Sequence, residues 1–219
     1  MDVHEVLDTW GETVVQAHGR GQVVLYRYAD DVVSGCEREE DARRISEVLP
    51  QRFATYGLAI NTEKTTVVRC GRPQRPSAAH QPGTFSLRGF VHYWGKTWRG
   101  SSTIKRKTEG KRLRRTLGEV WRWCRDNRHR APQAQYVLLG AKLRGYYQYD
   151  GVRCNSPCLD LVYDAATRAW RYWLNRRGGR KMTGRACGRM MAAYPLPRPK
   201  IVQGWVECRG GPGNAEQLG

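Results

Sequence analysis

The chain has 219 residues, enough for one large domain or two small ones, and 40% of them are hydrophobic. Eight Trp and eleven Tyr exclude a wholly disordered chain, because such chains are poor in aromatic residues. Lys and Arg outnumber Asp and Glu by 38 to 20, and the net charge of +18 predicts a polyanionic partner: RNA, DNA or an acidic membrane.

The lack of a recognisable targeting segment and the cysteine content both predict a cytoplasmic location. No run of about 18 apolar residues is present, so we expect no membrane span. The acidic start, residues 1–5, lacks a signal-peptide pattern. Seven Cys are an odd number, which favours reduced thiols over a disulfide framework. Cys154 and Cys158 are spaced to touch a metal, but no second pair at zinc spacing follows them.

The charge is divided unevenly along the chain. Residues 1–71 hold 8 Lys and Arg against 12 Asp and Glu, a net charge of −4. Residues 72–219 hold 30 against 8, a net charge of +22. The sequence therefore predicts one part suited to cations and another suited to phosphates.

The acidic part is predicted to mix helices and strands. Apolar periodicity predicts a helix over residues 4–18, and then two strands, 23–28 and one resuming at Val32, with Asp30 and Asp31 at the turn between them. A further helix is expected from 39 to about 56. Pro50 should kink that helix or split it in two.

The middle of the chain is predicted to be β-rich and irregular. We expect a β-rich segment over 65–70 and a linker or surface loop over 71–83, which contains three Pro and two Gly. Alternating character over 84–94 predicts a hairpin, and residues 95–102 are rich in turn formers.

Three helices are expected next, over about 106–127, 133–149 and 156–177, with Ser156 as the N-cap of the third. Short loops between helices of this length predict an antiparallel bundle. The remaining residues, 179–219, form a basic tail rich in Gly and Pro, and we expect the last ten to be disordered.

Asp30 and Asp31 are the sharpest local feature. Two adjacent carboxylates repel each other, and a divalent cation relieves that repulsion. Nucleotidyl transfer uses such a site, where two Mg²⁺ ions about 4 Å apart stabilise the attacking and leaving oxygens. From these residues alone a plain hairpin turn remains the alternative, because Asp favours turns.

The basic segment 105–130 holds 11 Lys and Arg against three acids. A solvated helix face normally mixes signs, because like charges at i,i+4 destabilise a helix. We therefore favour phosphate binding over a solvated face. The basic residues expected to contact RNA are Lys105, Arg106, Lys107, Lys111, Arg112, Arg114, Arg115, Arg144, Arg171, Arg176 and Arg177.

Aromatic residues in the helical part are expected to divide between core and surface. Trp121, Tyr146, Trp170 and Trp173 lie at helical spacing with aliphatic residues, so we expect them in the core rather than as stacking platforms. Tyr147, which lies off that stripe as Tyr149 does, is a candidate for stacking on RNA bases.

Residues from about 4 to 205 resemble the C-terminal part of bacterial group II intron reverse transcriptases, the intron-encoded maturases. The segment 27–31 (Arg-Tyr-Ala-Asp-Asp) is similar to the family's catalytic motif and its lead-in. The other similar segments follow in the family's order: 4–8 before it, then 49–65, 89–95, 105–113, 143–147, 170–174 and 194–199.

The resemblance implies an α+β fold. Residues 1–71 would be the C-terminal part of a reverse-transcriptase palm, 72–103 a connection and the hairpin that closes the palm, and 104–178 a helical thumb or maturase domain. It also implies an RNA-directed DNA polymerase that assists intron splicing. The partners would be group II intron RNA and an RNA–DNA hybrid or target DNA.

The resemblance further implies that Asp30 and Asp31 hold Mg²⁺ and that Lys64 acts on the nucleotide side, as a proton donor to pyrophosphate. For Lys64, an exposed Lys after a turn is the alternative. Fingers, a further palm aspartate and a Gly-rich block of the family have no counterpart in this sequence. Polymerase activity is therefore expected only if an N-terminal reverse-transcriptase fragment completes the palm. The alternatives are an RNA-binding maturase remnant without enzymatic activity and a non-functional product of a truncated gene.

Overall fold

The computed structural model describes residues 20–28, 31–61, 65–73, 83–177 and 183–203. They form helices and antiparallel strands, which confirms the α+β class. The chain divides into two compact units, residues 1–88 with 92–104 and residues 89–91 with 105–219. The helix expected over 4–18 lies outside the described residues.

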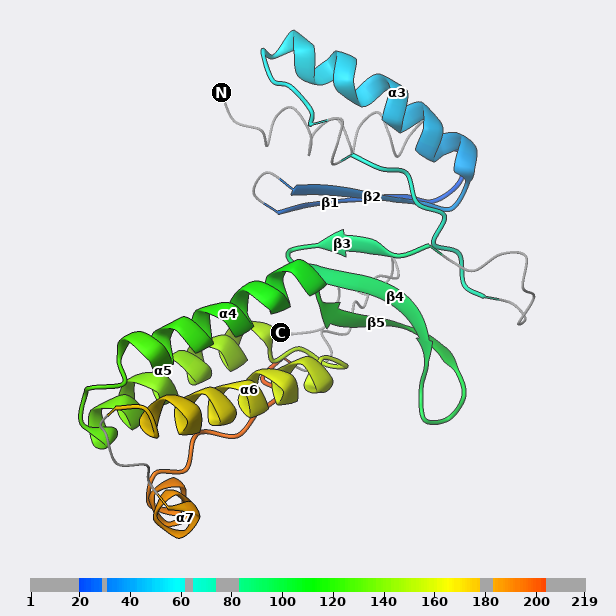
Figure 1. The fold of residues 1–219 in the computed structure, drawn as a ribbon. Helices are drawn as coiled ribbons and strands as arrows, with labels where there is room; N and C mark the ends of the chain where they lie inside the picture. The colour runs from blue at the N-terminus through cyan, green and yellow to red at the C-terminus, as the bar shows by residue number, and fades with distance from the viewer. Residues whose placement is uncertain (1–19, 29–30, 62–64, 74–82, 178–182, 204–219) are drawn as a thin grey trace, which may run out of the picture. The chain divides into compact units, whose positions relative to one another are not determined.

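A two-stranded antiparallel ribbon is the centre of the first unit. Strand β1 (Val23–Tyr28) pairs with β2 (Asp31–Cys36), in the register Val23 to Cys36 through Tyr28 to Asp31. Helix α3 (Glu39–Thr55) covers one face of this ribbon (Figure 1). Val23 of the ribbon and Ile45 of α3 are buried together, with Leu49 packed against them. The two strands predicted on either side of the acidic dipeptide are thus confirmed.

Helix α3 is anchored at its N-terminus by a buried carboxylate. Asp41 is 3% exposed, and its carboxylate accepts hydrogen bonds from the backbone N–H groups of Arg20 (3.3 Å) and Gly21 (3.0 Å). The helix continues through Pro50 as a single element, so it is not split there. Pro50 is exposed, and Ile45 and Leu49 before it pack on the ribbon.

The β-rich segment 65–70 does not form a strand. Hydrogen bonds from other segments hold its second half instead: the indole N–H of Trp94 donates to the carbonyl of Cys70 (3.0 Å), and the N–H of Gly83 donates to the carbonyl of Arg69 (2.8 Å). The prediction of β structure is wrong here because β propensity produces a strand only where a neighbouring strand is available to pair.

Strands β3 (Phe85–Leu87), β4 (Phe90–Lys96) and β5 (Ser102–Thr108) form a sheet in the order β3-β4-β5. The predicted hairpin is confirmed, and its two-residue turn has positive φ at Arg88 (54°) and Gly89 (76°). Positive φ at both central residues is the pattern of the type I′ turn, whose twist matches that of paired strands. The sequence prediction began a helix at about residue 106, whereas those residues belong to β5.

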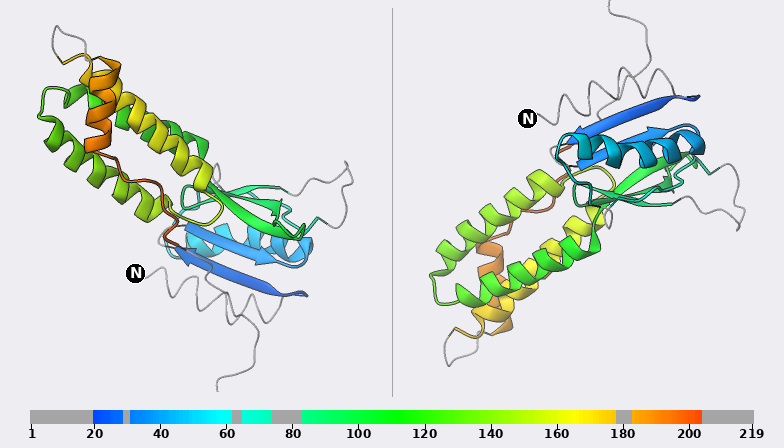
Figure 2. Two further views of the ribbon diagram at one scale, coloured as in Figure 1. Left: turned by 90° about the horizontal axis from the view of Figure 1, so that it is seen from below. Right: turned by 90° about the horizontal axis from the view of Figure 1, so that it is seen from above.

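Helices α4 (Gly110–Asp126), α5 (Pro132–Asp150) and α6 (Ser156–Leu174) form the predicted antiparallel bundle (Figures 1 and 2). Its core contains Cys124 of α4, Leu139 and Leu143 of α5, and Trp170 of α6, all at most 1% exposed. The N-cap of α6 is Asn155 rather than Ser156.

Part of the basic tail packs on this bundle. Helix α7 (Gly184–Ala193), which the sequence analysis did not predict, begins where the Thr183 hydroxyl accepts a hydrogen bond from the N–H of Ala186 (3.3 Å). Leu196 is 4% exposed within the bundle core, and the N–H of Val202 donates to the carbonyl of Gly151 (2.7 Å). The last ten residues lie outside the described part of the chain.

None of the helices that the structure describes combines the length and the apolar character needed to cross a membrane.

Candidate catalytic hairpin and nucleic-acid interface

Asp31 begins β2 at the tip of the ribbon, where its backbone pairs with Tyr28. Residues two apart on a strand point to the same face, so Asp31 shares its face with Val33 and with Tyr26, the cross-strand partner of Val33. Tyr26 is 62% exposed, whereas Val23 on the opposite face is buried against α3. Asp31 is itself exposed. The ribbon therefore presents this carboxylate on the face opposite α3.

The other two residues predicted to act in catalysis, Asp30 and Lys64, lie outside the described residues. Within the described part of the chain, no three His, Cys, Asp or Glu side chains gather into a metal site. Asp41 cannot serve as a third carboxylate, because it is buried and bonded to backbone amides. The carboxylates of Asp30 and Asp31 are the kind of oxygen ligand that the hard cation Mg²⁺ prefers. A complete site needs more carboxylates than the described residues bring to this place.

Lys105, Arg106 and Lys107 lie on β5 rather than on a helix. Alternate residues of a strand point to opposite faces, so Lys105 and Lys107 share one face and Arg106 lies on the other. Lys107 is exposed, and the other two are partly buried. The structure therefore distributes this predicted RNA-binding run over two faces of a strand.

Helix α4 carries the clearest basic surface. Its exposed basic residues recur at intervals of three, four and seven, which places them on one face of a helix of 3.6 residues per turn. We call this set the α4 basic face: Lys111, Arg114, Arg115, Arg122 and Arg125. From Lys111 to Arg125, 14 steps of about 1.5 Å, this face extends about 21 Å along the helix axis.

The charges of the α4 basic face are only partly offset. Arg125 bonds to Asp126 (2.8 Å), and Arg115 lies 3.9 Å from Glu119. Both pairs are exposed to solvent, and such ion pairs contribute little to stability. The side chains of Arg114 and Arg122 instead donate to backbone carbonyls one turn earlier, at Gly110 and Gly118 (both 3.3 Å). Neither arginine therefore has an acidic partner among the described residues.

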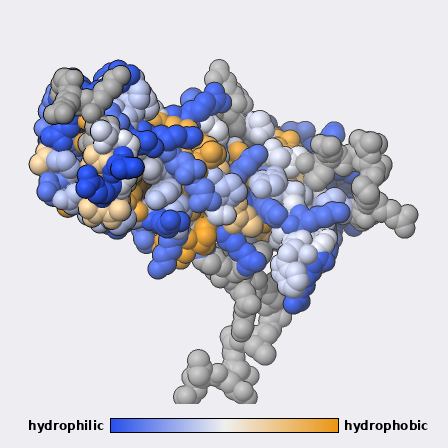
Figure 3. Space-filling model, turned by 60° about the horizontal axis from the view of Figure 1, so that its bottom comes forward, coloured by the Kyte–Doolittle hydropathy of each residue, from blue (hydrophilic) through white to orange (hydrophobic). Residues whose placement is uncertain are grey.

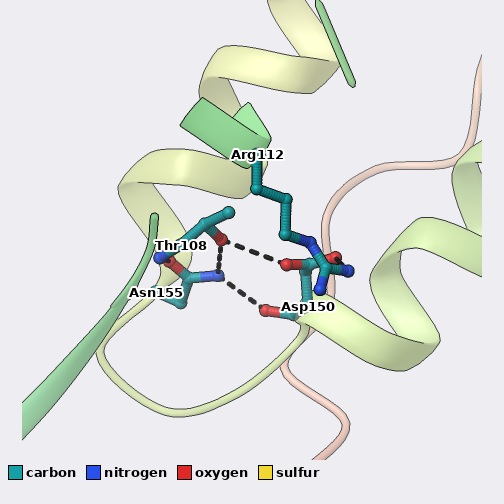
Figure 4. A network of polar contacts seen from close by, with 4 residues as sticks. All are labelled: Thr108, Arg112, Asp150 and Asn155. Atoms are coloured by element: carbon teal, nitrogen blue, oxygen red, sulfur yellow. Dashed lines mark hydrogen bonds and ion pairs between the residues drawn. The ribbon is translucent and has the colours of Figure 1, made fainter. Parts of the chain in front are cut away.

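Arg112 has a different role from its neighbours. Its guanidinium donates to the carboxylate of Asp150 at 3.0 Å, and that carboxylate has no exposed surface (Figure 4). Asp150 also accepts from the hydroxyl of Thr108 (3.1 Å), and Asn155 donates to that hydroxyl and to the carbonyl of Asp150 (both 2.8 Å). Arg112 was expected to contact phosphate, but the structure commits it to this network.

The network joins the end of β5 to the ends of three helices, since its members come from β5, α4, the last residue of α5 and the N-cap of α6. Burial is the largest influence on Asp150 and raises the pKa of its carboxyl above the ordinary value, while the charge of Arg112 and the hydrogen bond from Thr108 oppose that rise. A buried ion pair of this kind positions elements and is costly to break.

The remaining predicted RNA-binding residues lie at several places on the bundle. Arg144 on α5 and Arg171 on α6 are exposed; Arg176, just after α6, is exposed and Arg177 is partly buried. Tyr147 is only 3% exposed in the bundle core, so the structure contradicts its predicted stacking on RNA bases. The sequence contained an indication of this burial, because Tyr147 follows Leu139 and Leu143 at intervals of four residues and so shares their face of the helix.

Aromatic residues of α4 and α6 also differ from the prediction. Trp170 is fully buried as expected, whereas Trp121 is 41% exposed and lies beside Tyr172 and Trp173. A space-filling view shows hydrophilic residues over much of the visible surface, with apolar patches between them (Figure 3). Exposed aromatic and basic residues together are a common property of surfaces that bind nucleic acid.

No curated protein matches this chain. The family model of reverse transcriptase (RNA-dependent DNA polymerase) matches residues 3–132, which include the ribbon with Asp31, the three-stranded sheet and helix α4. Since this match spans more than half of the chain, the protein belongs to the reverse transcriptase (RNA-dependent DNA polymerase) family.

Proposed function

We propose that this chain is the C-terminal portion of a group II intron reverse transcriptase and maturase, and that it binds intron RNA through its helical part. The observation that carries the proposal is the α4 basic face, where Arg114 and Arg122 have exposed charges without acidic partners among the described residues. The reverse-transcriptase match supports the same interpretation, because residues 3–132 include both the acidic ribbon tip at Asp31 and the α4 basic face.

RNA binding by this surface requires no acid–base chemistry from side chains. Phosphates release condensed counterions when Lys and Arg neutralise them, so affinity falls as salt concentration rises. Group II RNA supplies its own active site for splicing, and a maturase needs only to hold the folded RNA. An exposed row of arginines on a rigid helix is suited to that task.

In the polymerase role, Asp30 and Asp31 would hold Mg²⁺ together with carboxylates from outside the described residues. The ions, when bound, would stabilise the attacking and leaving oxygens of nucleotidyl transfer. Asp31 contributes an exposed carboxylate on the face of the ribbon opposite α3, where it would meet the metal ions. An N-terminal reverse-transcriptase fragment is the partner that we propose to complete this site.

The RNA-binding proposal is tested by the salt dependence of affinity for single-stranded RNA and for intron RNA. With about six phosphate contacts, log K should fall against log salt with a slope of about −4 for single strands. Replacing Arg114 and Arg122 together by Ala should make that slope shallower by about 1.4, because each phosphate contact contributes about 0.7.

A matched control removes the same charge elsewhere. Arg43 and Arg44 are exposed neighbours on α3, and their double Ala variant should leave the slope unchanged. Affinity that is insensitive to salt, or equal effects of the two double variants, would contradict binding through α4. Intron RNA bound no better than unrelated RNA of equal length would contradict the maturase assignment.

A further inference from the structure

Three aromatic rings form an exposed cluster where α4 and α6 end. The ring centroid of Trp121 on α4 lies 5.0 Å from that of Tyr172 and 5.7 Å from that of Trp173, both on α6, and the two α6 rings are 5.1 Å apart. Two arginines lie over these rings: the guanidinium of Arg176 is 4.2 Å from the Tyr172 centroid, and that of Arg128 is 5.8 Å from the Trp173 centroid. We call these five residues the aromatic–arginine cluster.

Core packing does not account for this cluster. Trp173 is partly buried against the bundle core, but Trp121 and Tyr172 keep 41% and 39% of their surface exposed. Exposing a large aromatic surface forgoes the free energy gained by burying it. The core of α4 is complete without Trp121, because Leu113, Leu117, Val120 and Cys124 supply its contacts.

The position of Trp121 links the cluster to the α4 basic face. Trp121 follows Arg114 by two helical turns and precedes Arg125 by one, so it borders that face along the helix. A nucleic-acid strand whose phosphates follow the basic face would therefore bring its bases near the exposed indole. Arg128 and Arg176 add positive charge over the Trp173 and Tyr172 rings.

We propose that the aromatic–arginine cluster is a stacking site for an unpaired base of single-stranded RNA, with the two arginines contacting the flanking phosphates. This inference rests on the proposed function, because it assigns to one place on the bundle the recognition of unpaired RNA. Aromatic side chains stack on any base, whereas bases of a duplex are already stacked and paired. The cluster therefore distinguishes unpaired from paired RNA without reading a particular sequence.

Fluorescence anisotropy with a labelled single-stranded RNA and a duplex of the same sequence tests the site in the full chain. Trp121→Leu keeps an apolar side chain but removes the aromatic face, and should weaken single-strand affinity at least about fivefold, as expected for the loss of one stacked base. Trp121→Tyr should retain most of the affinity. Duplex affinity should change less than twofold in either variant.

Leu161→Ala on α6 is the matched control, because it shortens an exposed apolar side chain on the same bundle and should leave both affinities unchanged. The slope of log K against log salt should also be unchanged in Trp121→Leu, since no phosphate contact is lost. Equal single-strand affinity in the wild type and Trp121→Leu, with binding otherwise intact, would overturn the stacking site alone. If the wild-type chain binds neither RNA, the proposed function is overturned as well.

Discussion

Asp150 has no exposed surface, and its carboxylate depends on Arg112 and Thr108 for partners. Removing one member of a buried ion pair leaves the other charge unpaired in a poorly solvated site. In the sequence Arg112 looks like one more arginine of a basic helix. In the structure it balances the buried charge of Asp150. Its replacement should therefore affect stability rather than RNA affinity.

We expect Arg112→Met to lower the free energy of unfolding by about 3–5 kcal/mol at pH 7, the range for a broken buried pair. Burial already raises the pKa of Asp150, and loss of Arg112 raises it further. The folded variant then binds a proton more tightly than the unfolded chain does. The loss of unfolding free energy relative to wild type should therefore be largest at a pH above the pKa of Asp150 in the folded variant. It should shrink as the pH falls through that pKa, because Asp150 then becomes neutral.

Urea unfolding of both proteins at pH 7 and at pH 4.5 measures this difference. Arg115→Met is the control, because Arg115 is exposed and lies 3.9 Å from an exposed Glu119, so its loss should cost less than about 0.5 kcal/mol. A deficit for Arg112→Met that stays constant or grows on acidification would contradict the role assigned to Asp150.

At the scale of elements, the β3–β4 hairpin depends on its turn. Gly89 has φ of +76°, and a Cβ built on it would lie 2.8 Å from a terminal guanidinium nitrogen of Arg112. The glycine therefore serves both the turn and the close approach of the side chain that pairs with Asp150. Its backbone also contributes, since the Gly89 carbonyl accepts from the N–H of Glu109, just before α4 (2.9 Å).

Gly89→Ala should lower the free energy of unfolding by more than about 1 kcal/mol, because a left-handed backbone costs an L-residue about 1–2 kcal/mol. Gly145 lies inside α5 with open space where a Cβ would stand. Gly145→Ala should therefore stabilise the protein, by about 0.5–1 kcal/mol. Chemical unfolding followed by circular dichroism measures both variants. An unchanged free energy of unfolding in Gly89→Ala would argue against a constrained turn.

For the whole molecule, the candidate metal-binding carboxylate and the basic surface belong to different units, so the two proposed properties can be tested separately. Asp31 belongs to the unit with the ribbon, whereas the α4 basic face belongs to the unit with the bundle. If catalysis and RNA binding are divided in this way, a change in one unit should leave the property of the other intact.

Asp31→Asn should abolish Mg²⁺-dependent primer extension when the chain is combined with a matching N-terminal reverse-transcriptase fragment, because an amide is a much weaker magnesium ligand than a carboxylate. Affinity for single-stranded RNA should change less than twofold. Primer-extension gels and anisotropy on the same preparations measure both properties. Extension by the isolated wild-type chain would show that the palm is more complete than we propose.

Sequence patterns identified the local elements where one short-range signal was sufficient. Alternation around the acidic dipeptide predicted β1 and β2, and periodic Leu and Trp predicted the three helices of the bundle. The same reasoning failed where pairing partners decide the outcome. Residues 65–70 have β propensity but no strand, and the basic run at 105–107 belongs to β5 because β4 lies beside it.

By itself the sequence determined the family-like order of motifs, the α+β class and the division of charge, because these depend on composition and on neighbours along the chain. Only the tertiary structure decided which arginine is a counter-ion and which aromatic ring remains at the surface. Arg112 and Arg114 are two residues apart in one basic run, yet one pairs with a buried carboxylate and the other faces solvent. The physical reason is that burial and pairing depend on residues distant in sequence, such as Asp150 for Arg112 and Tyr172 for Trp121.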